Sequence, residues 1–319
     1  MMNRRDFARS VAGLAAGTAA TEWSPRLAVA DELQAGASGT APFKISVMLW
    51  TVFRGQPLEQ RLEKVAEAGY HAVEFVDEFK GWSKQDFASF RKKKAELGIE
   101  IDATAGVWHS LADSNDREPF LAALREFMGV MHELECTRLV LQTGNAVPGI
   151  SRQAMHDNCI EALKRGADIA AENNIELLPE NIDPEENPKY FLTSCAEGFD
   201  IVRAVGNPHV KFLCDFFHEQ IAEGNLIKKL DKNMDILGLV HVADVPGRHE
   251  PGTGEIYYPN IYRKLAELNY NRYIAMEFLP VGEPVAALRE AREAALKFGA
   301  ATHKQSSNAN PSGRSHATA

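Results

Sequence analysis

The chain has 319 residues, 45% of them hydrophobic, and carries a formal net charge of -9. This length fits either two domains or one large α/β barrel, since such barrels form single domains of 250 residues or more. The acidic balance and the lack of a basic stripe argue against a nucleic-acid partner.

The N-terminal segment has the pattern of an export signal. Arg4 and Arg5 are followed by Phe7, a short alanine-rich run and an A-x-A motif that ends at Ala30. This pattern resembles a twin-arginine signal, which predicts export of the folded chain to the periplasm and a mature protein that starts near Asp31. The apolar run is too short for stable membrane insertion. An ordinary amphipathic helix is the alternative interpretation.

Between the ends, eight short apolar or β-branched runs alternate with segments of helical periodicity. The runs predict strands at 44–50, 71–76, 99–106, 137–144, 175–181, 210–215, 237–244 and 273–278. The periodic segments predict helices at 57–69, 83–98, 120–134, 152–174, 195–206, 224–234, 258–269 and 283–299, with C-caps at Gly69 and Gly98.

Eight such units predict an α/β fold, a single-domain (β/α)8 TIM barrel. A doubly wound sheet is the alternative, but the glycine-rich first turn typical of that fold is missing after the first run. We therefore assign residues 1–30 to the signal, 31–42 to a linker, 43–300 to the barrel and the polar segment 301–319 to a disordered tail.

The four cysteines are scattered and have no zinc-like spacing. They are Cys136, Cys159, Cys195 and Cys214, and we expect them to be free core residues. If the chain resides in an oxidising compartment, Cys159 and Cys195 are the pair that could form a disulfide.

Four chemically related side chains stand at the ends of consecutive predicted strands. Glu180 ends the fifth, Asp215 ends the sixth, His241 lies near the end of the seventh and Glu277 near the end of the eighth. In a TIM barrel these ends form one rim, where the active site lies. Charged groups inside apolar runs are costly unless they are paired or bind a metal, so the four predict a site for a divalent cation. Their oxygen-rich character favours Mg²⁺ or Mn²⁺.

A divalent cation in such a site can hold two neighbouring oxygens of a small hydroxy-carbonyl compound and stabilise the enediolate that forms when the α proton leaves. Glu180 and Glu277 lie three strands apart and can flank the substrate as an acid–base pair. The sequence shows no nicotinamide, flavin or phosphate-binding loop, and an internal proton shift requires none of them.

Two segments carry a family resemblance. The stretch "HVADVPGRHEPGTGEIYYP" at 241–259 resembles the "ADNPxRxEPGTGEINY" signature of the hydroxypyruvate isomerase group of xylose-isomerase-like barrels, which also contains ketose 3-epimerases. The stretch "CDFFHEQIAEGNL" at 214–226 is similar to that group's "YDIYHMQxMEG" segment. The resemblance covers most of residues 43–298.

The resemblance implies metal ligation by Glu180, Asp215, His241 and Glu277. It also implies that His218 and Arg248 hold substrate oxygens and that Glu74 supports the site from the second strand. Glycines at 252 and 254 would permit positive φ in a loop that folds over the pocket. Two departures from the isomerase pattern concern the substrate. The isomerases commonly have Gln at the position of His241, where the epimerases have His. The His-Asn pair that the isomerases carry after the third strand is replaced here by "TAGVWHS", in which His109 is a candidate substrate contact.

Three functions remain open at this point. The first is interconversion of hydroxypyruvate and 2-hydroxy-3-oxopropanoate. The second is isomerisation or 3-epimerisation of a keto sugar on the same site, and the third is a periplasmic sugar-binding protein without turnover; a lyase or dehydratase that starts from the same enolate is a further variant. The expected partner is thus a small hydroxy-carbonyl compound or sugar, and the sequence leaves a monomer or a homo-oligomer open.

Overall fold

The computed structural model describes residues 40–300, which lie within the unit Ser38–Ala319. The predicted export signal at 1–30 and the predicted tail at 301–319 lie outside the described residues, as does most of the predicted linker. Within 40–300, no helix is both long enough and apolar enough to cross a bilayer.

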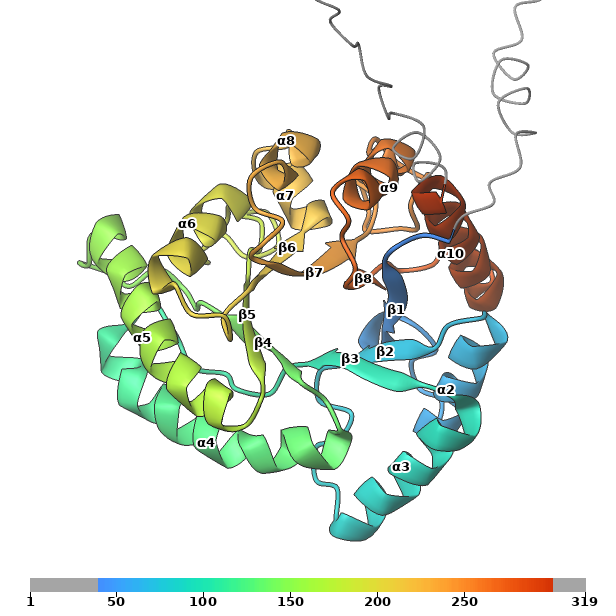
Figure 1. The fold of residues 1–319 in the computed structure, drawn as a ribbon, viewed down its shortest axis with the longest axis horizontal. Helices are drawn as coiled ribbons and strands as arrows, with labels where there is room; N and C mark the ends of the chain where they lie inside the picture. Colours follow the sequence, from blue (N-terminus) through green and yellow to red (C-terminus); the bar gives the residue numbers. More distant parts are fainter. Residues whose placement is uncertain (1–39, 301–319) are drawn as a thin grey trace, which may run out of the picture. The chain divides into compact units, whose positions relative to one another are not determined.

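The described residues form a closed barrel of eight parallel strands with helices around it (Figure 1). Neighbouring strands pair in chain order, and β1 closes the barrel by pairing with β8. The predicted (β/α)8 TIM barrel is therefore confirmed. The strands are β1 (Lys44–Met48), β2 (Ala72–Phe75), β3 (Glu100–Thr104), β4 (Arg138–Gln142), β5 (Glu176–Glu180), β6 (Phe212–Asp215), β7 (Leu237–Val242) and β8 (Tyr273–Met276).

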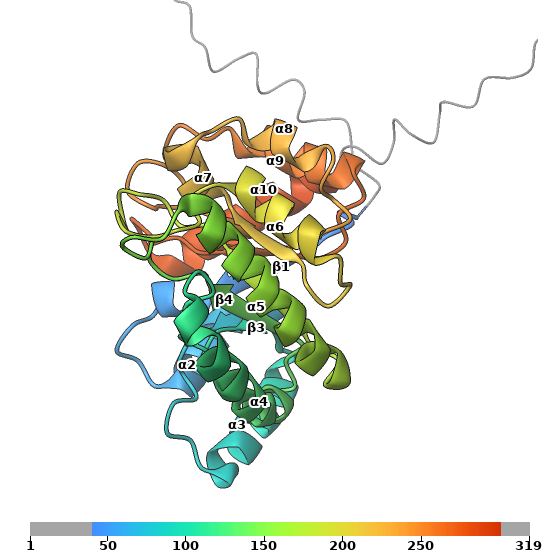
Figure 2. The ribbon, with the colours of Figure 1, turned by 90° about the vertical axis from the view of Figure 1, so that its left-hand side faces the viewer.

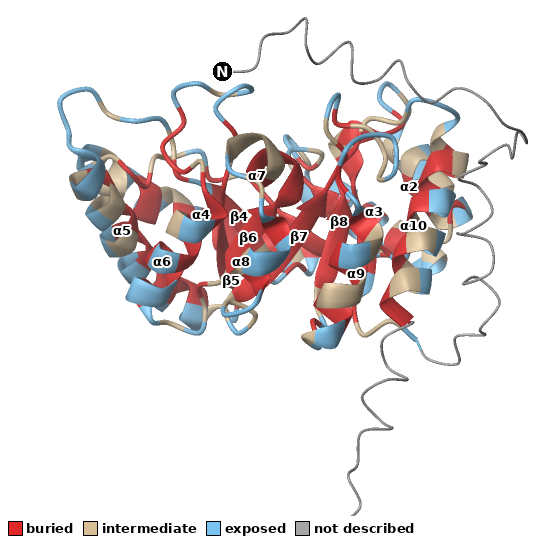
Figure 3. Ribbon diagram, turned by 90° about the horizontal axis from the view of Figure 1, so that it is seen from above, coloured by how far each residue is buried: buried red, intermediate tan, exposed pale blue. Residues whose placement is uncertain are grey.

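The strands are buried on both faces. Every residue of β2, β6, β7 and β8 is buried, and Figure 3 shows the strands as a buried centre with helices whose outer faces are exposed. Parallel strands covered by helices are nearly continuous apolar runs for this reason. The charged members of these runs, Glu74, Asp215 and His241, therefore need specific partners.

The helices follow the predicted periodic segments and lie outside the strands. Helices α4 and α5 lie side by side (Figures 1 and 2). A capping box of Ser83 and Asp86 starts α3, and Gly98 ends it in the left-handed conformation, as predicted. At α2 the C-cap is Ala68, and Gly69 follows with φ of +87°. The helices are α2 (Leu58–Glu67), α3 (Lys84–Leu97), α4 (Arg117–Leu134), α5 (Arg152–Glu172), α6 (Cys195–Val205), α7 (Phe216–Ala222), α8 (Leu226–Leu230), α9 (Tyr258–Glu267) and α10 (Pro284–Ala300), with 3-10 turns η2 (Leu49–Thr51) and η3 (Ser114–Asp116).

The segment after β6 differs from the prediction of one helix over 224–234. It forms two short helices, α7 and α8, and α7 begins directly at the end of the strand. The cause is Asp215, whose Oδ1 accepts hydrogen bonds from the backbone N–H groups of Phe217 and His218. His218 consequently lies in the first turn of a helix whose start is fixed by a predicted metal ligand.

The expectation of four free cysteines was wrong, as was the suggested Cys159–Cys195 pair. Cys195 forms a disulfide with Cys214, while Cys136 and Cys159 are free and buried. Cys195 is the first residue of α6 and Cys214 lies on β6, and these two elements pack against each other. The pairing thus depends on helix-on-strand packing, which cysteine spacing does not reveal.

Gly198 allows this close packing of α6 on β6. A Cβ at this position would lie 2.1 Å from the ring of Phe212, which is fully buried and packs edge-on against Phe199. We expect Gly198→Ala to lower the free energy of unfolding by about 1–3 kcal/mol, because the ring cannot move aside without disturbing the core. Urea denaturation measures this difference. The control is Gly129→Ala on the exposed face of α4, where nothing lies within 4 Å and a gain of about 0.5–1 kcal/mol is expected.

Candidate metal centre and active site

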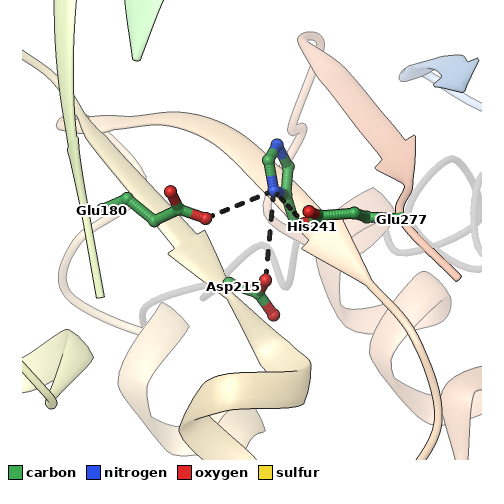
Figure 4. A group of neighbouring side chains, drawn as sticks. All are labelled: Glu180, Asp215, His241 and Glu277. Atoms are coloured by element: carbon green, nitrogen blue, oxygen red, sulfur yellow. Dashed lines mark hydrogen bonds and ion pairs between the residues drawn. The ribbon is translucent and has the colours of Figure 1, made fainter. Parts of the chain in front are cut away.

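Four buried side chains converge at the carboxyl ends of β5 to β8. Glu180, Asp215, His241 and Glu277 each offer one ligand atom, and these atoms lie within 4.8 Å of one another. Figure 4 shows the three carboxylates around Nδ1 of His241. That nitrogen lies 2.7 Å from Glu277 Oε2, 3.5 Å from Glu180 Oε1 and 4.0 Å from Asp215 Oδ2.

The strand register explains this convergence. Glu180 and Asp215 are the last residues of their strands, Asp215 pairs with His241, and Glu277 directly follows β8 with its N–H bonded to the Val242 carbonyl. Parallel strands in a barrel end on the same side. Residues remote in the sequence are therefore placed around one point by backbone pairing alone.

The cluster fits a divalent cation on its own chemistry. Asp215 Oδ2 is buried and finds no hydrogen-bond partner among residues 40–300, which is costly unless another group satisfies it. Burial raises the pKa of Asp215, although His218 opposes this shift. Burial alone would also raise the pKa of Glu277, but Arg248 and His241 hold it well below its ordinary value. Three carboxylates and one imidazole form the hard donor set that Mg²⁺ or Mn²⁺ accepts.

Glu74 lies on the opposite side of the His241 ring. Its Oε2 is 2.9 Å from His241 Nε2, and it is 1% exposed. Burial raises the pKa of Glu74 to about 8, against the opposing effect of His241. A carboxylate at the second ring nitrogen fixes the orientation of a metal-binding histidine. Glu74 thus occupies a supporting position behind His241 and also lines the pocket.

Arg248 bridges the cluster and the loop after β5. Its guanidinium lies 2.7 Å from Glu277 Oε1 and 2.8 Å from Glu186 Oε2. It also lies over the rings of Trp50 and Phe217, 5.5 Å and 5.1 Å from their centroids. Burial lowers its pKa, but the surrounding carboxylates outweigh this and raise it above its ordinary value. Arg248 also has a φ of +57°, a conformation that is uncommon for residues other than glycine and that clusters at functional sites.

The loop that carries Arg248 is fixed from inside by Asp244. Its Oδ1 accepts from the N–H groups of Val245 and Ile256, and its Oδ2 accepts from Gly252. The expected positive φ is present at Gly252, at +101°, but not at Gly254. Gly254 is required for a different reason, because a Cβ there would lie 2.0 Å from the Val245 carbonyl oxygen.

His218 is held by Asp183, a residue that the sequence analysis did not identify. Asp183 Oδ2 forms a hydrogen bond with His218 Nδ1. Asp183 Oδ1 accepts hydrogen bonds from the backbone N–H groups of Glu185 and Glu186. Burial lowers the pKa of His218, but Asp215 and Asp183 outweigh this effect and raise it to about 9. One fully buried carboxylate therefore orients His218 and, through the backbone, Glu186.

We expect Asp183→Asn to lower kcat/KM about 10- to 100-fold, the usual cost of losing a residue that orients a site histidine. The Asn oxygen can still accept from the loop N–H groups, whereas its amide cannot accept from His218 Nδ1–H. Steady-state kinetics on the metal-loaded protein measures the loss. Asp235→Asn, at an exposed carboxylate, is the matched control, and equal kinetics for both variants would exclude this role for Asp183.

A pocket of about 310 Å³ surrounds the cluster. Asp215 does not line this pocket. Six of the other residues predicted for the site do: Glu74, Glu180, His218, His241, Arg248 and Glu277. His109 does not line it, since its Nδ1 lies 2.8 Å from Asp116, while its neighbour Trp108 lines the pocket and is 55% exposed.

Sequence reasoning also missed Trp50, whose Nε1 donates to Glu277 Oε1 at 3.1 Å. Trp50 stands at the carboxyl end of the first predicted strand. Active-site residues of a TIM barrel lie at these strand ends, so the argument that identified the four ligands could have identified Trp50 as well. Glu186 had no such signal, because it lies within a loop.

Comparison with known proteins identifies a family and several relatives. The family model described as xylose isomerase-like TIM barrel matches residues 62–298. A protein of Danio rerio, named provisionally as a hydroxypyruvate isomerase, is 31% identical over 269 residues, which cover 79% of this chain and 96% of its own length. A 2-oxo-tetronate isomerase of Pectobacterium atrosepticum is 27% identical over 248 residues, which cover 75% of this chain and 93% of the relative.

Solved structures with the same fold belong to proteins of more than one activity. A structure described as an AP endonuclease of family 2 from Brucella melitensis has a TM-score of 0.70 at 26% identity, and the match covers 78% of this chain and 96% of that chain. An L-ribulose 3-epimerase also has a TM-score of 0.70, at 18% identity, and the match covers 84% and 99% of the two chains. The likeness to the second structure concerns the fold alone.

Proposed function

The chain belongs to the xylose isomerase-like TIM barrel family, and from this premise we propose that it is a metal-dependent isomerase that moves a proton α to a carbonyl group. The observation that carries the proposal is the convergence of four ligand side chains around one point, beside a pocket that three of them line. The four are Glu180, Asp215, His241 and Glu277, and all but Asp215 line the pocket. A divalent cation bound there would stabilise negative charge on two neighbouring substrate oxygens.

The side chains divide into two roles. Glu180 and Glu277 approach the centre of the cluster from β5 and β8, so one can remove the α proton and the other can return it to the neighbouring carbon. Arg248 and His218 carry N–H donors that line the same pocket and can hold the substrate's carbonyl and hydroxyl oxygens. Glu180, Glu277, Arg248 and His218 are all buried, which limits the contact of these groups with bulk water.

For the substrate we propose hydroxypyruvate, converted to 2-hydroxy-3-oxopropanoate. The similarity to the Danio rerio relative supports this choice. The second candidate is isomerisation or 3-epimerisation of a keto sugar, which the imidazole at His241 favours. A nucleic-acid substrate is disfavoured by the formal net charge of -9 and by the carboxylate-rich pocket.

Exchange of the substrate's α proton with solvent deuterium tests the proposal. The metal-loaded chain is incubated with hydroxypyruvate and with keto sugars, and exchange is followed by NMR. Exchange that depends on both the metal and Glu277 supports the isomerase. The absence of exchange with every compound, in protein that demonstrably binds the metal, would favour a binding protein without turnover.

We further propose that the chain is exported through the twin-arginine route and acts in the periplasm. The Cys195–Cys214 disulfide supports this, because such bonds persist in oxidising compartments and are rare in the bacterial cytosol. Cell fractionation of the full chain and of an Arg4→Lys, Arg5→Lys variant tests it. Retention of both proteins in the cytoplasm would contradict export.

A further inference from the structure

The side chain of Asn181 is bonded to the backbone of the predicted metal ligand Asp215. Asn181 directly follows Glu180, the last residue of β5, and is fully buried. Its Oδ1 accepts from the Asp215 N–H at 3.0 Å, and its Nδ2 donates to the Asp215 carbonyl oxygen at 3.2 Å. Asn181 is not among the described residues that line the pocket around the cluster, so any effect on the site must pass through Asp215.

These two hydrogen bonds complete the restraint on Asp215. Strand β5 pairs with β6 through Glu180 and Leu213, two residues before Asp215. The Asn181 amide extends this connection to Asp215 itself, because one planar group satisfies both the N–H and the carbonyl oxygen of that residue. Oδ1 of Asp215 is already held at the start of α7, and Oδ2 has no hydrogen-bond partner among residues 40–300. The position of Oδ2 in the cluster therefore depends on a backbone that Asn181 holds.

The Cys195–Cys214 disulfide packs against the same amide. Cys214 is the residue before Asp215, and Cys195 Sγ lies 3.3 Å from Asn181 Oδ1. Both cysteines are fully buried. The backbone N–H of Cys195 donates at 2.6 Å to Glu219 Oε2 on α7. The disulfide thus joins the start of α6 to the end of β6, beside Asp215, while the Cys195 backbone is anchored to α7.

Reduction of this bond would disturb the arrangement. Two thiol sulfurs need more space than two sulfurs joined by a covalent bond. Helix α6 packs closely on β6, since a Cβ at Gly198 would lie 2.1 Å from the Phe212 ring, and close-packed interiors transmit such strain. The added separation must therefore displace either the first turn of α6 or the part of β6 around Cys214, next to Asp215.

We propose that Asn181 and the Cys195–Cys214 disulfide together position the Asp215 carboxylate, so that the affinity of the centre for a divalent cation depends on both. Asn181 is then a positioning residue, and the disulfide maintains the backbone on which it acts. This inference rests on the metal centre of the proposed function, but it requires neither a particular substrate nor turnover. Because coupling between two equilibria is reciprocal, a disulfide that tightens metal binding must itself be stabilised by the bound metal.

Calorimetric titration of Mg²⁺ into the chelator-treated full chain tests the role of Asn181. We expect Asn181→Ala to raise the Kd about 10- to 100-fold, the usual cost of losing a group that orients a metal ligand. The matched control is Asn173→Ala, which removes a side-chain hydrogen bond to the Ile169 carbonyl at the C-cap of α5, before β5 begins. Thermal unfolding of the metal-free proteins reports folding separately. A folded Asn181→Ala variant with the Kd of wild type would reduce Asn181 to a structural role.

The oxidation state of the disulfide gives a second test, which needs no substitution. We expect reduction to raise the Kd for Mg²⁺ about tenfold, and saturating Mg²⁺ to lower the reduction potential of the disulfide by about 30 mV, the same factor for a two-electron couple. Equilibration with glutathione, followed by alkylation and mass analysis of the Cys195 and Cys214 peptides, measures this potential with and without Mg²⁺. The hard cation Mg²⁺ is suitable because thiols bind it weakly.

A chain without the disulfide completes the comparison. The variant that combines Cys195→Ala and Cys214→Ala should bind Mg²⁺ as weakly as the reduced wild type, and its Kd should not respond to the redox buffer. The variant that combines Cys136→Ala and Cys159→Ala, at the two free and buried cysteines, is the control and should respond as wild type does.

The possible failures are distinct. If wild type binds Mg²⁺ and neither Asn181→Ala nor reduction changes the Kd, the inference is wrong and the metal centre stands. A change with Asn181→Ala alone would remove the disulfide from the proposal. If wild type binds neither Mg²⁺ nor Mn²⁺, the metal centre fails and this inference fails with it. A chain that shows the expected changes in Kd but exchanges no substrate proton would contradict the isomerase alone.

Discussion

Replacing Glu277 with Gln is expected to lower kcat about a thousandfold, within the range of about 10² to 10⁴ that a positioned acid or base contributes. The Glu277 carboxylate accepts from Trp50 Nε1 and from Arg248, and its other oxygen lies 2.7 Å from His241 Nδ1. An amide of the same shape cannot take up and return a proton. It also leaves one of these donors without an acceptor. Deuterium exchange into the substrate measures the effect on the proton transfer itself.

Glu180→Gln is expected to cause a loss of similar size, because the two carboxylates act at successive steps. Glu96→Gln, in an exposed i,i+4 pair with Lys92 on α3, is the matched control and should leave kcat unchanged. Because both site carboxylates are also predicted ligands, metal content is measured for each variant. A Glu277→Gln protein that is folded, metal-loaded and fully active would exclude Glu277 as the acid–base group.

The barrel was predictable because its determinants are local. Each strand is a short run of buried apolar residues and each helix a longer periodic segment, so the order of the elements follows from the sequence. The position of the candidate site was predictable from the fold, because its four ligands stand at the same end of parallel strands. These ligands are Glu180, Asp215, His241 and Glu277. Topology turned four separate weak signals into one cluster.

The features that sequence reasoning missed depend on contacts between elements. The helix α7 begins directly after β6 because the Asp215 side chain caps it. The sequence does not reveal this start, because the apolar residues of the strand continue into the helix as "FFHE". The Cys195–Cys214 pair requires α6 to pack on β6. Asp183 is recognisable only once the loop after β5 turns back toward His218.

His109 and Trp108 illustrate the same limit within one loop. The two residues are neighbours, and the turn after β3 decides which side chain faces the pocket. Asp116 holds His109, and Trp108 lines the pocket. A conformation of this kind is set by η3 and its hydrogen bonds, which the family motif does not encode.

The second large effect that we expect is a loss of metal affinity in the Asp215→Asn variant. Asp215 Oδ1 caps α7, while Oδ2 faces the cluster without a hydrogen-bond partner among residues 40–300. Asn preserves the capping oxygen and replaces Oδ2 with an amide that cannot bind a cation. We therefore expect the variant to fold, to lose at least about 100-fold in affinity for Mg²⁺ or Mn²⁺, and to lose activity accordingly.

Thermal unfolding separates this effect from a general loss of stability. A metal at a hundredfold excess over its Kd stabilises a protein by about 2.7 kcal/mol, so Mn²⁺ should raise the Tm of chelator-treated wild type and leave Asp215→Asn unaltered. Asp200→Asn, on the exposed face of α6, should respond as wild type does. If the metal stabilised Asp215→Asn as strongly as wild type, the cation would have to bind elsewhere, and the acid–base scheme built on Glu180 and Glu277 would lose its electrostatic basis.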